Sequence, residues 1–236
     1  MDILWRGLSE ALHLIAHGDP QLRQIASLSL LVSLSATLLA GFVGVPLAVT
    51  LVATHFGGRA IALTAVNTGM GLPPVVVGLG VSILLWRTGP LGPLALLYTP
   101  AAMVFAQFLV AAPLVTGFTR SALELLNPDM LEALRVDGAA PPTAGYELVR
   151  AALPQVLVAL AAGFGRAIAE VGASLMVGGN ILGHTRILTT AIALETQRGD
   201  FALAIALGLV LLAIAFAVNA ALTVLSGVKV WPAWTS

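Results

Sequence analysis

Residues 163–180 read GFGRAIAEVGASLMVGGN. This stretch is mostly apolar, and its only charged residues are Arg166 and Glu170 near its middle. A charge at the centre of a bilayer costs about 2.5 to 3.5 kcal/mol on insertion scales, so we expect both side chains to face protein groups or a water-filled space rather than lipid. The stretch therefore predicts a helix at the centre of a membrane-embedded bundle.

Composition places the rest of the chain in a membrane as well. Of its 236 residues, 58% are hydrophobic and only 9% are charged, which is too few charges to cover a water-soluble globule. The eleven basic and eleven acidic residues balance, so neither nucleic acid nor a strongly anionic surface is a predicted partner. Because the chain has no cysteine and its four histidines are scattered, we predict no disulfide and no metal site.

Five apolar stretches are long enough to cross a bilayer, which takes a helix of about 20 residues. They are Leu28–Val52, Ala60–Trp86, Tyr98–Phe118, Gln155–Val177 and Phe201–Leu225. Lipid cannot satisfy exposed backbone groups, and the alternating strands of a membrane barrel are missing from the sequence. We therefore predict an all-α integral membrane protein with five transmembrane helices. Within the second stretch, Pro73 and Pro74 predict either a tolerated kink or a broken helix that lines a cavity.

The predicted bundle fills residues 27–225, with a different segment at each end. Residues 1–26 are expected to form an amphipathic segment, because apolar residues recur at helical spacing between Met1 and Pro20, as in an interfacial helix. Residues 226–236 are expected to form a C-terminal tail.

The longest polar interruption, residues 120–153, separates the third and fourth spans. Asn127 is predicted to cap a helix opened by Pro128, and Gly138 to end it. A second short helix is predicted to start near Thr143 and to run towards the pair Leu153-Pro154. The two helices would make a rigid polar knob, and a plain solvated loop is the alternative.

Part of this interruption, EALRVDG at residues 132–138, resembles the cytoplasmic loop of ABC importer permeases. That loop carries Glu-Ala-Ala, then three residues, a glycine and, further on, Leu-Pro. Here Leu134 replaces the second alanine, and the interval from Gly138 to Leu153 is longer than usual. The resemblance implies a short coupling-helix loop on the cytoplasmic side. The residues that would couple it to a separate ATPase are Glu132, Ala133, Asp137 and Gly138.

Three further stretches carry a closer resemblance. They are NTGMGLPPVVVGL at residues 67–79, FGRAIAEVGASLMVGGNI at 164–181 and HTRILTTAIALETQRGDFALAIALG at 184–208. They resemble the permease subunit of tungstate-type ABC importers, in the group that moves tungstate, molybdate, sulfate and phosphate. The resemblance implies three protein partners: an ATPase, a periplasmic or extracellular oxyanion-binding protein and a second copy of the permease. It favours tungstate as substrate, with molybdate and then sulfate or phosphate as alternatives.

The sequence itself also indicates that ATP is hydrolysed by a separate chain. The sequence has no GxxxxGK[ST] loop, and its only lysine is Lys229. We therefore predict a chain that is not an enzyme and has no catalytic residue or cofactor of its own, with ATP and magnesium on the partner ATPase. A membrane-embedded enzyme is the first rival, but it would cluster acids or histidines, and Glu170 is the only acid well inside a span. A structural subunit is the second rival, and it predicts no dependence on ATP.

The candidate residues of a translocation pathway are Arg166, Glu170, Ser174, Asn180, Pro73 and Pro74. On a continuous helix Arg166, Glu170 and Ser174 share one face. The charged pair has two interpretations. It is either a structural ion pair, or a cation near the route of a dianion whose position Glu170 restrains. The polar stretch 180–190 is interpreted mainly as solvated or as a docking surface for the binding protein.

Orientation depends on the resemblance. If Glu132 faces the cytoplasm, five spans put the N-terminus outside and the C-terminus in the cytoplasm of a multi-pass protein of the cell (inner or plasma) membrane. Basic residues divide evenly between the two sides, so the positive-inside rule does not decide the orientation.

Overall fold

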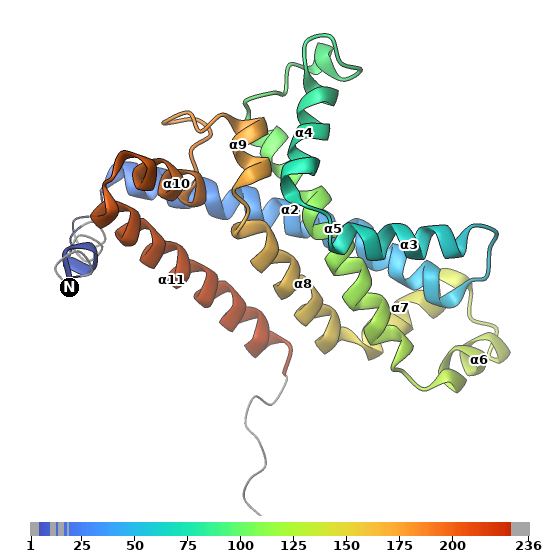
Figure 1. Ribbon diagram of the computed structural model, residues 1–236. Coiled ribbons are helices and arrows are strands. Elements are labelled where there is room, and N and C mark those ends of the chain that lie inside the picture. The colour runs from blue at the N-terminus through green and yellow to red at the C-terminus, as the bar shows by residue number, and fades with distance from the viewer. Residues whose placement is uncertain (1–4, 10–12, 14–16, 18, 228–236) are drawn as a thin grey trace, which may run out of the picture.

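The structure is a computed structural model that describes residues 5–9, 13, 17 and 19–227, and this part of the chain is helical without strands (Figure 1). Three helices are long and apolar enough to cross a membrane: α2 (Pro20–Ala53), α5 (Pro100–Glu124) and α11 (Phe201–Leu225). Two bent pairs raise the number of candidate spans to five: α3 (Arg59–Met70) with α4 (Pro74–Leu85), and α7 (Pro141–Ala151) with α8 (Leu153–Ile168). The shorter elements are η1 (Gly92–Leu94), α6 (Pro128–Val136), α9 (Gly172–Gly178) and α10 (Leu188–Arg198). The predicted all-α membrane fold is confirmed.

The first long helix begins earlier than predicted. The side chain of Asp19 accepts a hydrogen bond of 2.7 Å from the N–H of Leu22, and Pro20 opens α2. Consequently, α2 takes in the last residues of the predicted segment 1–26. Most of the apolar positions that predicted an interfacial helix lie outside the described residues, as do residues 228–236 of the predicted tail.

Helices α2 and α5 pack closely because small residues face each other. A Cβ added to Gly44 would lie 2.8 Å from Oγ1 and 3.3 Å from the backbone N of Thr116. Further along the pair, Ser33 donates a hydrogen bond of 3.1 Å to Gln107, and Gln107 donates one of 3.0 Å to Ser174 of α9. All three side chains are buried. The bonds satisfy these polar groups in the core and join α2, α5 and α9.

The second span is broken where the two prolines predicted an interruption. Helices α3 and α4 meet at 108°, with Pro73 as the N-cap of α4 and Pro74 as its first residue. Both prolines lack an N–H, so a helix start costs them no hydrogen bond. The broken-helix alternative, rather than a mild kink, is what the structure has.

The prediction of a continuous fourth helix over Gln155–Val177 is wrong. Helix α8 ends at Ile168, the backbone leaves the helix over residues 169–171, and α9 begins at Gly172. The carboxylate of Glu170 accepts a hydrogen bond of 2.9 Å from the N–H of Ala173, so it satisfies one of the free donors at the start of α9. Glu170 follows Arg166 by four residues, and this spacing is the same whether Glu170 lies on one continuous helix or at the start of a new one. Sequence periodicity therefore cannot detect the break.

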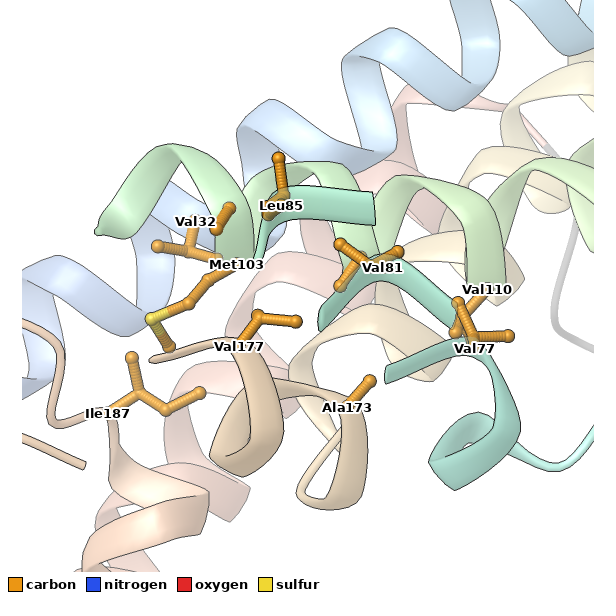
Figure 2. Packing of buried hydrophobic residues seen from close by; sticks show 11 residues of the cluster. Val32, Val77, Val81, Leu85, Met103, Val110, Ala173, Val177 and Ile187 are labelled. Carbon is orange, nitrogen blue, oxygen red and sulfur yellow. The ribbon is translucent and has the colours of Figure 1, made fainter. Parts of the chain in front are cut away.

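The two breaks lie side by side. A Cβ on Gly172 would lie 2.8 Å from Cγ2 and 3.8 Å from the backbone N of Val75, and 3.7 Å from Oε1 of Glu170. One turn along α4, a Cβ on Gly78 would lie 2.7 Å from the Cα of Ala173. Val77 and Val81 of α4 and Val177 of α9 belong to one buried cluster with Met103 and Val110 of α5 (Figure 2). We call α4 and α9 together the α4–α9 layer.

Candidate coupling surface and charged helix break

The polar knob between α5 and α8 consists of two helices with defined ends. Oδ1 of Asn127 accepts a hydrogen bond of 3.0 Å from the N–H of Asp129, which confirms the predicted cap of α6. The helix ends where Gly138 takes a φ of +78°. Helix α7 begins at Pro141, two residues before the predicted start near Thr143, because proline suits the first helical position.

One side of the knob is buried and the other is exposed. Leu148 of α7 is buried in a cluster with Ala48 of α2, Leu123 of α5, Val156 of α8 and Ala152 between α7 and α8, and the partly buried Met130 and Leu131 of α6 pack against this cluster. The predicted coupling residues Glu132, Ala133, Asp137 and Gly138 are all exposed. A docked pair of helices with an exposed edge is the geometry of a rigid knob, not of a slack loop.

We expect Gly138→Ala to lower the free energy of unfolding by about 1 to 2 kcal/mol, because a Cβ is disfavoured at a left-handed φ. Thermal unfolding of the detergent-solubilised protein measures the effect. Gly57→Ala is the control, since that glycine also lies in a loop and nothing stands within 4 Å of an added Cβ. Equal melting temperatures for the two variants would contradict the prediction.

The charged pair spans the break between α8 and α9. Nη1 of Arg166 lies 3.5 Å from Oε2 of Glu170. The Glu170 side chain is 2% exposed, whereas that of Arg166 is 32% exposed. The backbone carbonyl of Glu170 also accepts a hydrogen bond of 3.0 Å from Thr189 of α10. Glu170 is therefore held at three points, and Arg166 is the partner that remains accessible.

The other predicted pathway residues divide between two places. Pro73 and Pro74 start α4, whose next residue, Val75, lies against the break of the fourth span. Ser174 is fully buried and bonded to Gln107. Asn180 lies apart from these residues in the turn between α9 and α10, with a φ of +52°, and donates a hydrogen bond of 3.2 Å to the carbonyl of Thr190. Thus the structure groups five of the six residues around the paired breaks.

Sequence reasoning missed two polar groups that the structure makes prominent. Gln107 stands alone among apolar residues in the third span, and a lone amide in such a span predicts a hydrogen bond to a neighbouring helix. The hydrogen bonds of Gln107 to neighbouring helices could therefore have been predicted from the sequence. Arg135 of α6 donates a hydrogen bond of 2.7 Å to the carbonyl of Ala53. The sequence does not predict this bond, because the partner is a backbone group distant in sequence.

A bundle with broken helices and an exposed knob is a permease architecture, and the comparison with protein families agrees. Residues 40–227 match the model of the binding-protein-dependent transport system inner membrane component, so the chain belongs to this family of ABC transporter permeases.

Individual relatives are more specific. The chain is 40% identical over 220 residues to the tungstate uptake system permease protein TupB of Peptoclostridium acidaminophilum, covering 93% of this chain and 96% of that protein. It is 38% identical over 223 residues to the protein of the same name from Campylobacter jejuni subsp. jejuni, covering 93% and 92%. A solved bacterial ABC transporter involved in the import of the acidic polysaccharide alginate has the same fold. Its TM-score is 0.73 at 18% identity, over 90% of this chain and 81% of that one.

Proposed function

We propose that the chain is the membrane subunit of an ATP-driven importer that carries a tetrahedral oxyanion, with tungstate as the first candidate. The observation that carries this proposal is the 40% identity to a tungstate uptake permease over nearly the whole length of both chains. The absence of a phosphate-binding loop from the sequence supports a separate ATPase chain as the motor.

The proposed assembly has three further components. An ATPase docks on the exposed edge of the knob at Glu132, Ala133, Asp137 and Gly138. An oxyanion-binding protein delivers the substrate to the opposite side, and a second copy of this chain completes the pathway. This arrangement puts the knob and the C-terminus in the cytoplasm and the N-terminus outside.

Within the membrane, we assign the cation of Arg166 to the oxyanion pathway. Its partial exposure in the single chain supports this role, because a group that meets a passing ion must be accessible. Glu170 and Ser174 are buried and hydrogen-bonded, so their part is to hold the break in shape. Asn180 shapes the turn at the proposed outer end of α9.

Reconstitution tests the proposal. The purified permease, together with the ABC ATPase and oxyanion-binding protein of the same organism, is placed in liposomes, and uptake of tungstate is measured with and without ATP. We expect uptake that requires both ATP and the binding protein. An excess of molybdate is expected to compete more strongly than sulfate or phosphate. If none of these anions enters the liposomes, the proposed function is rejected. If molybdate or sulfate is taken up in preference to tungstate, that anion is the substrate instead of tungstate.

A further inference from the structure

The C-terminal end of α2 is held by arginines from two other helices. The last four carbonyls of a helix have no partner within it, and the final residues of α2, TLVA at 50–53, include no basic side chain. Nε of Arg59, the first residue of α3, donates a hydrogen bond of 2.8 Å to the carbonyl of Leu51. Nη2 of Arg135 donates one of 2.7 Å to the carbonyl of Ala53. Two cations therefore complement the negative end of this helix dipole.

Arg135 differs from Arg59 because it belongs to the knob. Arg59 is near α2 in sequence and joins neighbouring elements, whereas Arg135 bonds a residue far back in the chain. Arg135 is also three residues after Glu132, so the two side chains lie on adjacent turns of the same nine-residue helix. A displacement of the exposed edge at Glu132 would move the guanidinium of Arg135, and with it the end of α2.

The far part of α2 is bonded to the elements beyond the helix break. Ser33 reaches α9 through Gln107 and Ser174, and Oγ of Ser29 accepts a hydrogen bond of 2.8 Å from the N–H of Leu188 at the start of α10. Ser33 and Ala53 are about 30 Å apart along the helix, at 1.5 Å per residue. Thus α2 has the knob at its C-terminal end, its middle is bonded to α9 from Ser33 through Gln107, and α10 lies beside its N-terminal part (Figure 1).

We propose that Arg135 is a positioning residue for energy coupling, which passes the movement of α6 to α2 and through α2 to α9. The proposal rests on the proposed function, since it needs an ATPase that moves the knob. The hydrogen bond is solvent-exposed, so it adds little to folding, and a coupling role is separable from a stabilising one.

The test compares Arg135→Ala, Arg135→Lys and Arg23→Ala in the reconstituted complex. Arg23 is an exposed arginine near the start of α2, away from the knob, and serves as the control. For each variant, three quantities are measured: co-purification with the ATPase, ATP hydrolysis with and without the binding protein, and anions imported per ATP hydrolysed. The wild-type complex must first couple import to hydrolysis, and failure at that step rejects the proposed function rather than the role of Arg135.

We expect Arg135→Ala to keep the ATPase bound and to lower the number of anions imported per ATP by about fivefold or more, the lower end of typical coupling effects. Arg135→Lys retains a cationic donor and should recover most of the ratio, and Arg23→Ala should match the wild type. An unchanged ratio in Arg135→Ala would overturn the proposal. Loss of the bound ATPase would overturn it too, because Arg135 would then be a docking residue.

A double-mutant cycle tests the route through α2. Ser33→Ala removes the other end of the connection, about 30 Å away, and effects at such a distance normally add. If α2 carries the signal, Arg135→Ala should lower the import ratio little further once Ser33→Ala has broken the link to α9. Purely additive effects on that ratio would exclude this route.

Discussion

Replacing Glu170 with alanine is expected to destabilise the protein by about 3 kcal/mol, the lower end of the range for breaking a buried ion pair. The change leaves the guanidinium of Arg166 without its partner, and it removes the acceptor for the N–H of Ala173 at the start of α9. We take the lower end of this range because the Arg166 side chain is 32% exposed, so its unpaired charge would be only partly buried. The effect is measured by size-exclusion chromatography of the heated, detergent-solubilised protein, as the temperature at which the height of the monodisperse peak falls to half.

The matched control is Glu124→Ala. Arg120 and Glu124 have the same spacing of four residues, but their side chains are 25% and 39% exposed. Removing this surface pair should cost less than about 1 kcal/mol. Similar losses of stability in the two variants would show that burial does not set the strength of the pair at the break.

A double variant separates structure from transport. Arg166→Gln with Glu170→Gln removes both charges and keeps hydrogen-bonding side chains at the break. If this protein folds normally and still imports the oxyanion with full coupling, Arg166 has no role in the pathway. Loss of import in a normally folded protein supports the assignment of Arg166 to the pathway.

Gly78→Ala is expected to cost about 1 to 3 kcal/mol, the usual range for overpacking. The added methyl group would lie 2.7 Å from the Cα of Ala173, a backbone atom that cannot turn aside as a side chain can. Helices α4 and α9 would have to separate, and the cluster of valines between them would loosen. The melting temperature of the solubilised protein should fall accordingly.

Gly80→Ala provides the control on the same helix. Nothing lies within 4 Å of a Cβ at this position, and alanine has the higher helix propensity. This variant should therefore be as stable as the wild type or more stable. A loss of stability equal to that of Gly78→Ala would mean that the α4–α9 contact is not the cause.

Much of the fold was predictable because membranes impose simple requirements on sequence. The long apolar runs of α2, α5 and α11 follow from the need to satisfy every backbone group inside lipid. The break at Pro73 and the cap at Asn127 also follow from local chemistry, since proline lacks a donor and asparagine supplies an acceptor.

The rest was not predictable because it depends on contacts between distant segments. The break after Ile168 has no proline, and it is stable only because Glu170 caps α9 beside the start of α4. Spacing correctly paired Arg166 with Glu170, but it could not show that the helix ends between them. The bond from Arg135 to the carbonyl of Ala53 involves a backbone group, whose position no side-chain pattern reports.

The paired breaks also bear on how the chain reaches its final shape during biosynthesis. A half-helix of 12 residues, such as α3 or α4, is about 18 Å long, and it cannot by itself cross a hydrocarbon layer about 30 Å thick. The first turns of α4 are packed against Gly172 and Ala173, which the ribosome adds only after α5 and the knob. The prolines can bend residues 59–85 locally, but the packing of α4 against α9 forms only after the fourth apolar segment has been made.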